Sequence, residues 1–339
     1  MEWLSRIVGG WTPSAATQRR VGVAAVVAQI GVALGGAVVR VTGSGLGCPT
    51  WPECAPGSLL PVSDPALGQA HQWIEFGNRL LGVAVGLVGA LALLVALLTR
   101  PRRRRFLLLA MTMPLGVVAQ AVIGGFTVLM ELEWWTVALH FVPSPVLVWC
   151  AVLLARAAGE QDGPARPRIP RPLRAMLVVM TVALAGTLVT GTLVTGAGPH
   201  AGDADTPRLD LPVAALTQLH SDVLFVFLGL VVALGFALRA AGAVRTLWRR
   251  YWLLVAAVLL QGALGAVQYW LGVPVVLAAL HVLGAMLTVA AMAGLWAARE
   301  ERDPLPVAAA SDTSTTSPSR TRRDESGDHA PAPSLPLSG

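Results

Sequence analysis

The sequence contains no lysine and is poor in charge of either sign. Only 13% of its 339 residues are charged, whereas a soluble domain of this size carries roughly 25%. Hydrophobic residues make up 55% of the chain and occur in long runs. This composition excludes a soluble globular domain and indicates an integral membrane protein.

Two further absences narrow the class of protein. No small-residue cleavage pattern follows the first apolar run, which is long enough to span a bilayer, so we expect no signal peptide. The net charge of +6 comes without a basic soluble face, which excludes nucleic acid as a partner. The apolar runs instead predict membrane lipid as the environment and partner of the chain.

The placement of the 25 basic residues, all arginine, predicts the topology. Of these, 22 lie in the N-terminal segment, in the loops near 100–105, 156–174 and 239–250, and in the C-terminal tail. Only three lie on the other side, and these are Arg40, Arg79 and Arg208. The positive-inside rule therefore places both termini in the cytoplasm of a multi-pass protein of the cell (plasma) membrane.

The predicted fold class is an all-α membrane protein with eight transmembrane helices. The expected spans are residues 21–41, 72–98, 106–130, 134–156, 173–195, 212–238, 251–272 and 274–298. We expect a cytoplasmic N-terminal segment (1–20), a first four-helix half (21–158), a cytoplasmic linker (159–172), a second four-helix half (173–298) and a disordered cytoplasmic tail (299–339).

An internal repeat predicts that the two halves are pseudo-symmetric four-helix bundles. Gln120 precedes His140 by 20 residues, and Gln261 precedes His281 by the same number. The loop sequence VTGSG at 41–45 has a counterpart, VTGAG, at 194–198. An offset of four spans keeps both copies in the same orientation, so their symmetry axis would run along the bilayer normal.

Three histidines lie within the apolar spans, where a polar side chain is costly and by default functional. His140, His220 and His281 each follow the start of a span by six to eight residues, so each is expected roughly 10 Å below the outer end of its helix. Asn78 occupies the equivalent depth in the second span. The alternative for any one of them is a hydrogen bond between helices.

Polar ligands at one depth on alternate helices suit a flat cofactor such as haem, whose iron two imidazoles can hold. His220 and His281 form a complete pair in the second half, whereas the first half offers His140 opposite Asn78, a poor iron ligand. This asymmetry predicts one permanent haem and one site with an open iron face. Zinc is less suitable, because a structural zinc site requires four close ligands.

Glu75 is the other costly residue, and it allows two interpretations. It forms either an ion pair with Arg79 that fixes the helix end or a carboxylate that exchanges protons beside the first-half cofactor. His71 is expected near the entrance of this site. His200 is expected to be solvated, bonded to Asp203 or close to a haem propionate.

Cys48 and Cys54 face the oxidising side in this topology, so a disulfide is permitted there. A structural role and a redox-active role both remain open, because C-x5-C is not the C-x-x-C signature of thioredoxins. Cys150 lies deep in the fourth span and is expected to pack as a small apolar residue.

Together these residues resemble the haem A synthase family in its bacterial form, over about residues 20–300. The marks of this resemblance are VTGSGLGCPTWPEC, IEFGNRLLG, VALHF, VTGAGPHAGD, QLHSD and LAALHVLG. The family has eight helices in two pseudo-symmetric halves. It oxidises the C8 methyl group of haem O to a formyl group, which gives haem A for aa3-type terminal oxidases.

The resemblance also implies roles for particular residues. His220 and His281 correspond to the axial ligands of a bound haem b, His140 to a ligand of the substrate haem and Glu75 to the essential carboxylate. Cys48 and Cys54 match an outer-loop pair that resembles a disulfide linked to activity or stability.

This chain departs from the family pattern at Asn78, because many members have E-x-x-H-R where it has Glu75-Phe-Gly-Asn78-Arg79. Single ligation by His140 would leave one iron face free. The resemblance implies haem O synthase as the source of the substrate, and a homo-oligomer remains an open expectation. The main alternative function is a non-catalytic membrane cytochrome b that passes electrons from quinol, and a repeat-based transporter is a second one.

Overall fold

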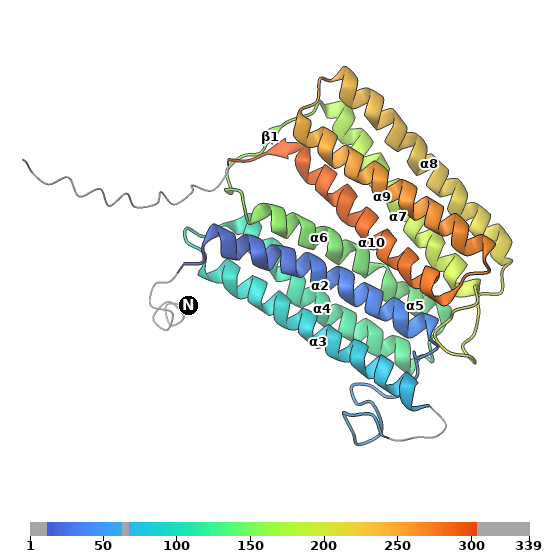
Figure 1. Cartoon of the computed structure of the whole chain (residues 1–339). Coiled ribbons are helices and arrows are strands. Elements are labelled where there is room, and N and C mark those ends of the chain that lie inside the picture. The colour runs from blue at the N-terminus through green and yellow to red at the C-terminus, as the bar shows by residue number, and fades with distance from the viewer. Residues whose placement is uncertain (1–11, 63–67, 304–339) are drawn as a thin grey trace, which may run out of the picture. The chain divides into compact units, whose positions relative to one another are not determined.

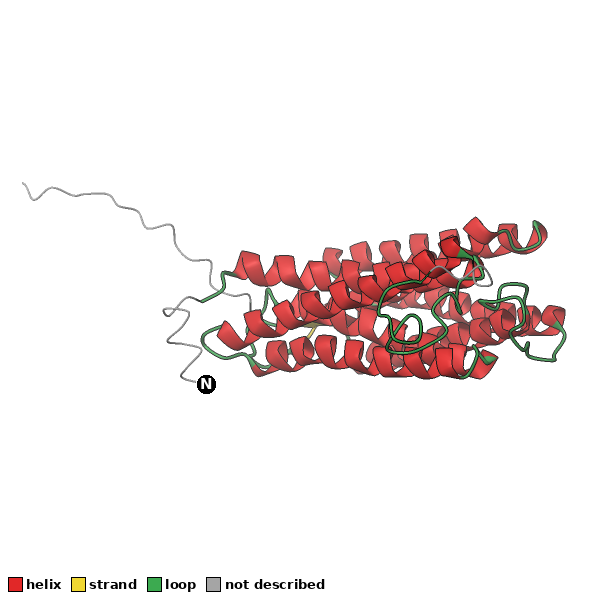
Figure 2. Ribbon diagram, turned by 90° about the horizontal axis from the view of Figure 1, so that it is seen from below, coloured by secondary structure: helices red, strands yellow, loops and turns green. Residues whose placement is uncertain are grey.

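The computed structural model describes residues 12–62 and 68–303, and all of them belong to one compact unit that spans residues 1–305. Eight apolar segments in it are long enough to cross a membrane, as the sequence predicts. Figure 1 shows the helices, and Figure 2 shows them running alongside one another. Most of the tail, including His329, lies outside the described residues.

The helices differ from the expected spans mainly at their ends. They are α2 (Ala15–Val41), α3 (Gln69–Leu98), α4 (Arg104–Leu129), α5 (Trp134–Phe141), α6 (Pro143–Ala157), α7 (Arg171–Ala197), α8 (Val213–Ala240), α9 (Arg245–Trp270) and α10 (Val275–Ala298). The N-terminal segment was expected to end at residue 20, but α2 begins at Ala15, where Ser14 caps it by accepting a hydrogen bond from the Thr17 amide.

The fourth span consists of two helices rather than one. α5 ends at Phe141 and α6 begins at Pro143. Proline lacks an amide hydrogen and clashes with the preceding turn, so Pro143 interrupts the helical hydrogen bonds. The corresponding helix of the second half, α10, has Gly284 at the equivalent point and continues without a break. The interruption falls three residues after His140.

The helices of the first half form a closed ring, in which α2, α3, α4 and α6 each pack against two neighbours. In the second half α7 pairs with α8 and α9 pairs with α10, but contact between the two pairs is slight. The halves meet where α10 packs on α2 and α6, and where α5 packs on α7.

The two ends of the bundle have different character. We call the end with the loops at 99–103, 158–170 and 241–244 the basic end, and the opposite end, which carries Cys48 and Cys54, the cysteine end. The basic end holds the apolar core of both halves, with Phe106 and Met113 in the first and Leu234 and Met292 in the second fully buried.

Polar contacts reinforce the basic end. Arg103 is buried, donates to the carbonyl oxygens of Ala157 (2.8 Å) and Glu160 (2.6 Å), and also bonds Gln18. Burial lowers the pKa of its guanidinium. The start of the tail is ordered, contrary to expectation, because β2 (Glu300–Glu301) pairs antiparallel with β1 (Arg166–Pro167) of the linker.

Two tight turns at the cysteine end have the same structure. Leu132, between α4 and α5, and Val273, between α9 and α10, both have a φ of +59°. The amide of Leu132 donates to the Thr127 carbonyl, and the amide of Val273 donates to that of Gln268. Leu132 and Val273 are 141 positions apart in the sequence, and so are their acceptors Thr127 and Gln268. This equivalence supports the internal repeat.

Candidate functional site

His220 of α8 is held in the state that a metal-binding imidazole requires. Its Nδ1 lies 2.9 Å from the Thr187 carbonyl oxygen and 3.2 Å from the Thr190 hydroxyl, both on α7. Because a carbonyl oxygen only accepts, Nδ1 donates and carries the proton. The lone pair therefore resides on Nε2, and the carbonyl fixes the ring orientation.

His281 of α10 is the second histidine of this half that lies within an apolar helix. Its Nδ1 is buried without a hydrogen-bond partner. Gln261 of α9 donates to the backbone carbonyl of His281 at 2.8 Å. Gly265, one turn along α9, lies against the ring, because a Cβ atom there would come within 3.0 Å of Cε1.

The first half repeats this arrangement around His140. Gln120 of α4 donates to the His140 carbonyl at 3.1 Å, and a Cβ atom at Gly124 would come within 2.9 Å of the ring. The Nδ1 atom of His140 is buried without a partner, as in His281. The four residues Gln120, Gly124, Gln261 and Gly265 therefore build equivalent seats for the two histidines.

Asn78 of α3 is the fourth of the polar residues that the sequence places at the histidine level. Its Oδ1 atom is buried without a hydrogen-bond partner. Gly35 of α2 lies against it, since a Cβ atom at Gly35 would come within 2.6 Å of Oδ1. A buried amide oxygen without a donor is costly, so this position is suited to a further group between the helices.

At the level of these residues the helices bury single polar atoms but no complete residue. In the second half the stretches without a buried residue are 188–195 of α7, 217–226 of α8, 259–270 of α9 and 275–285 of α10. In the first half they are 30–36 of α2, 76–84 of α3, 114–124 of α4 and 137–144 of α5 and α6. A close-packed bundle would bury inward-facing side chains at each turn, so each half is incompletely filled at its histidine level.

The donor set of the second half fits a haem. It offers one imidazole with a free Nε2 on α8 and a second imidazole on α10, at a level where no residue is fully buried. Among the described residues no cluster of three or more His, Cys, Asp or Glu side chains could hold a bare metal ion. The first half offers a single imidazole with Asn78, which fits a porphyrin held by one protein ligand.

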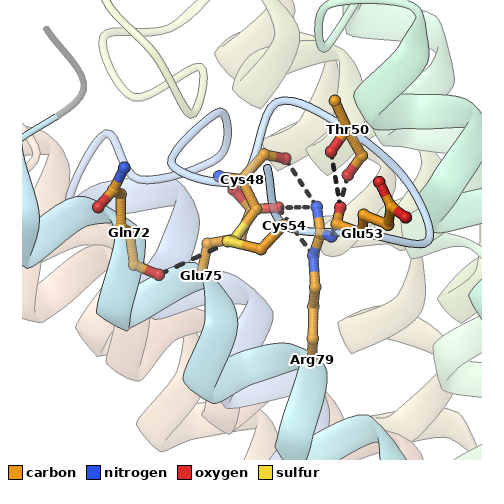
Figure 3. A network of polar contacts seen from close by, with 7 residues as sticks. All are labelled: Cys48, Thr50, Glu53, Cys54, Gln72, Glu75 and Arg79. Carbon is orange, nitrogen blue, oxygen red and sulfur yellow. Dashed lines mark hydrogen bonds and ion pairs between the residues drawn. A yellow bond between two sulfur atoms is a disulfide. The ribbon is translucent and has the colours of Figure 1, made fainter. Parts of the chain in front are cut away.

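A polar network at the cysteine end surrounds Glu75 (Figure 3). Glu75 is 5% exposed and accepts hydrogen bonds at both oxygens. Arg79, one turn along α3, donates to Oε1 from Nη2 at 2.7 Å, and the Cys48 amide donates to Oε2 at 2.6 Å. The ion pair that the sequence allowed is therefore present, and the hydrogen bond from the Cys48 amide ties α3 to the loop after α2.

Arg79 holds that loop through three carbonyl oxygens. Its guanidinium donates to Cys48 (2.7 Å), Thr50 (3.0 Å) and Glu53 (2.9 Å), and Figure 3 shows it pointing from α3 into the loop. The disulfide between Cys48 and Cys54 closes the same loop, as the family resemblance implies. One cation thus fixes both the carboxylate and the disulfide loop.

The disulfide loop also reaches the helix that seats His140. A Cβ atom at Gly125 of α4 would come within 2.5 Å of the indole ring of Trp51. Gly125 is adjacent to Gly124, which lies against His140. The loop therefore reaches α4 through Trp51, beside the glycine that lies against His140, and contacts Glu75 through Cys48.

Other predicted residues have more ordinary environments. His71 is exposed, and its Nδ1 lies 2.9 Å from the Gly43 carbonyl oxygen. His200 is half-buried and bonds the Val273 carbonyl at 2.8 Å, and its bond to Asp203, one of three alternatives that the sequence left open, is not found among the described residues. Cys150 is a free, half-buried cysteine that packs against the first-half core.

Sequence reasoning missed the glycines that seat the histidines and the α7 residues that orient His220. Gly124 and Gly265 are separated by the same 141 positions as the two histidines, so the repeat contained a signal for them. Thr187 and Thr190 carry no such signal, because their proximity to His220 depends on how α7 and α8 pack.

The fold and the site define an eight-helix membrane protein with one histidine seat repeated in two halves. The sequence pattern of the COX15-CtaA family, described as cytochrome oxidase assembly protein, matches residues 19–293. The chain therefore belongs to the COX15-CtaA family.

Curated relatives carry the name Heme A synthase. The chain is 30% identical over 185 residues to the one from Shouchella clausii strain KSM-K16, which covers 52% of the chain and 58% of the relative. It is 44% identical over 50 residues to that of Geobacillus thermodenitrificans, and this alignment covers 15% of the chain and 14% of the relative. For Halalkalibacterium halodurans it is 28% identical over 270 residues, covering 74% and 87%. The alignment thus spans between one seventh and seven eighths of these relatives.

Proposed function

We propose that this protein is a haem A synthase, which oxidises the C8 methyl group of haem O to a formyl group. The observation that carries the proposal is the pair of equivalent histidine seats, of which only one is complete, in a chain of this family. Two imidazoles can hold a haem iron from both faces, whereas the half with one imidazole leaves an iron face free. No comparison supports the quinol-linked cytochrome b alternative.

The second half would hold haem b as a resident cofactor, with His220 and His281 as axial ligands. Haem supplies one-electron transfer when it is bound. Thr187 and Thr190 fix the orientation of the His220 ring, and Gly265 leaves room for that of His281. Through these contacts the protein would orient the two imidazole ligands.

The first half would receive haem O, with His140 as its protein ligand and Asn78 on the opposing helix. Conversion of a methyl to a formyl group removes protons as well as electrons, so a base is required near the substrate. Glu75 lies three residues before Asn78, on the same side of α3. Its carboxylate is held by Arg79 and the Cys48 amide, and we assign it the proton-accepting role.

We also infer the cellular arrangement from the arginines. The basic end would face the cytoplasm with both termini, and the cysteine end would face outward, where a disulfide persists. The membrane is the plasma membrane, and haem O would arrive from haem O synthase.

The experiment is expression in a host that makes haem O but no haem A, followed by analysis of the extracted haems. We expect haem A to appear with the unmodified chain. Glu75→Gln keeps a similar shape without the charge and should lower conversion by about 100-fold or more, the range for loss of a positioned base. The matched control is Glu131→Gln, which removes an exposed carboxylate of the α4–α5 turn. An unchanged haem O pool beside folded protein contradicts the proposal.

The haem b assignment is tested on the purified protein. His220→Ala should remove the low-spin haem spectrum, whereas Glu75→Gln should retain it, because Glu75 lies in the other half. The control is His329→Ala, a histidine substitution in the tail. A low-spin spectrum that survives His220→Ala would reject the ligand assignment.

A further inference from the structure

Two of the three arginines of the cysteine end form no ion pair with a carboxylate of the described residues. Arg79 is paired with Glu75, but Arg40 and Arg208 take part in none of the ion pairs found between described residues. The nearest acidic residue in sequence to Arg208 on the same loop, Asp210, forms no ion pair with it, and Asp203 accepts from the Asp205 amide instead. Two cations thus stand without counter-ions at the end of an apolar bundle.

Both arginines lie at the end of α7. Arg40, in the last turn of α2, donates from Nη2 to the Thr195 carbonyl oxygen at 2.6 Å, and Arg208 donates from Nη1 to that of Gly198. The two guanidiniums are close enough for their charges to repel each other. The Nε atom of Arg40 is buried without an acceptor.

Capping of α7 explains only part of this arrangement. Cations at a helix C-terminus are favourable, and each arginine does bond one terminal carbonyl. A guanidinium has five N–H donors, however, so most donors of the pair remain unused in the observed contacts. Capping also gives no reason to bring two like charges together, with one donor buried and unsatisfied, which is costly. An anion between the two guanidiniums would offset the repulsion between their charges and would accept from the unsatisfied donor.

The position relative to His220 identifies the anion. Gly191 of α7 lies against the His220 ring, and Thr195, which receives Arg40, lies one turn further toward the cysteine end on the same face. At 1.5 Å per residue this is about 6 Å along α7. A porphyrin carries two carboxylates on one edge of an apolar ring, and arginine pairs with carboxylates through two parallel hydrogen bonds.

We propose that Arg40 and Arg208 bind the propionate carboxylates of the haem held in the second half. The inference rests on the proposed haem ligation by His220 and His281. Arg40 comes from the first half, and its bond to Thr195 crosses between the halves. The second-half site is therefore completed by a residue from the first half.

The test compares haem b with its dimethyl ester, which keeps the ring and iron but lacks both negative charges. The full chain is purified without haem and titrated with each compound, and the low-spin spectrum of the two-imidazole site is followed. We expect haem b to bind at least about tenfold more tightly than the ester, since hydrogen bonds to charged groups are among the stronger ones. A double variant, Arg40→Gln with Arg208→Gln, should bind both compounds with the affinity that the unmodified protein has for the ester.

The matched control is Arg239→Gln with Arg245→Gln, which removes two exposed arginines of the basic end. It should keep the preference for haem b. A double variant of Arg40 and Arg208 that retains the full preference overturns the proposal, and so does an unmodified protein that does not distinguish the two compounds.

One additional variant and one further outcome with the unmodified protein separate other causes. If the double variant does not fold, Arg208→Gln alone serves as the test. Arg208 is exposed, so its loss leaves the helix packing intact. We expect this variant to lose about half of the preference for haem b over the ester on a logarithmic scale. If neither compound produces a low-spin spectrum in the unmodified protein, the haem ligation of the proposed function fails instead.

Discussion

At the scale of single residues, Asn78 distinguishes the two halves. His140 and His281 have equivalent seats, each with a glutamine on the backbone carbonyl and a glycine against the ring. The partner of His281 is His220, whereas the partner position of His140 is Asn78, whose Oδ1 atom is buried and unsatisfied. The difference in iron ligation that we propose therefore depends on one side chain.

Asn78→His should give the first half a second imidazole. With haem O added, we expect the unmodified protein to show a high-spin signal from the first half beside the low-spin signal of the second. The variant should convert most of that high-spin signal to low-spin, because both iron faces are then occupied. Optical and electron paramagnetic resonance spectra measure the change.

The control for this substitution is Asn78→Gln, which keeps the amide and supplies no imidazole. It should leave the high-spin signal in place. Identical spectra for Asn78→His and the unmodified protein would show that position 78 does not face the substrate iron.

At the scale of elements, close helix approach prepares the histidine seats. α9 and α10 pack along their length, and Gly265 allows the His281 ring to lie directly on the α9 backbone. The same holds for α4 and His140 through Gly124. Because the ring lies directly on the helix backbone, even one added methyl group should move it.

Gly265→Ala should lower the haem content of the purified protein several-fold. The new Cβ atom would lie 3.0 Å from Cε1 of His281, closer than an ordinary contact, while alanine favours the helix over glycine by about 1 kcal/mol. Gly262→Ala on the same helix is the control, because no atom lies within 4 Å of a Cβ atom there. Haem content is measured as pyridine haemochrome per protein. Equal values for the two variants would contradict the role of Gly265 in leaving room for the His281 ring.

At the scale of the whole molecule, the two ends of the bundle have different tasks. The basic end holds the apolar cores, the buried Arg103 and the strand pair between linker and tail. The cysteine end holds the disulfide loop, the histidine levels and the contact between the repeated loops, where the Gly45 amide donates to Gly202 at 2.8 Å. Stability and chemistry are thus separated along the membrane normal.

This arrangement predicts which loops face outward. In a Cys150→Ser background, Leu59→Cys places a thiol on the exposed disulfide loop and Pro164→Cys places one on the exposed linker. A membrane-impermeant thiol reagent applied to intact cells should label position 59 nearly completely, and position 164 only after permeabilisation. The reverse pattern would overturn the proposed orientation.

Much of the fold could be predicted from the sequence, because hydrophobic length and arginine placement are local properties. All eight expected spans correspond to long apolar helices. The interruption at Pro143 and the helical start of VTGAG, where Val194 to Ala197 still belong to α7, were not predicted. Helix ends depend on caps and neighbours, which a hydropathy pattern does not contain.

The candidate site divides in the same way. Glu75 and Arg79 are four residues apart on one helix, so their pairing follows from helix geometry. The contacts of Arg79 with the disulfide loop, of His220 with Thr187 and of Arg40 with Thr195 join residues between 26 and 155 positions apart. No local pattern predicts such contacts.

The sequence by itself determined the membrane character, the eight helices, the repeat and the identity of the polar residues that the repeat places at one level. Only the tertiary structure decided which glycine seats which histidine, that one guanidinium holds both Glu75 and the cysteine loop, and that an arginine of the first half reaches the second. The physical reason is that burial in lipid acts on each helix separately, whereas hydrogen bonds between helices exist only after the helices have packed.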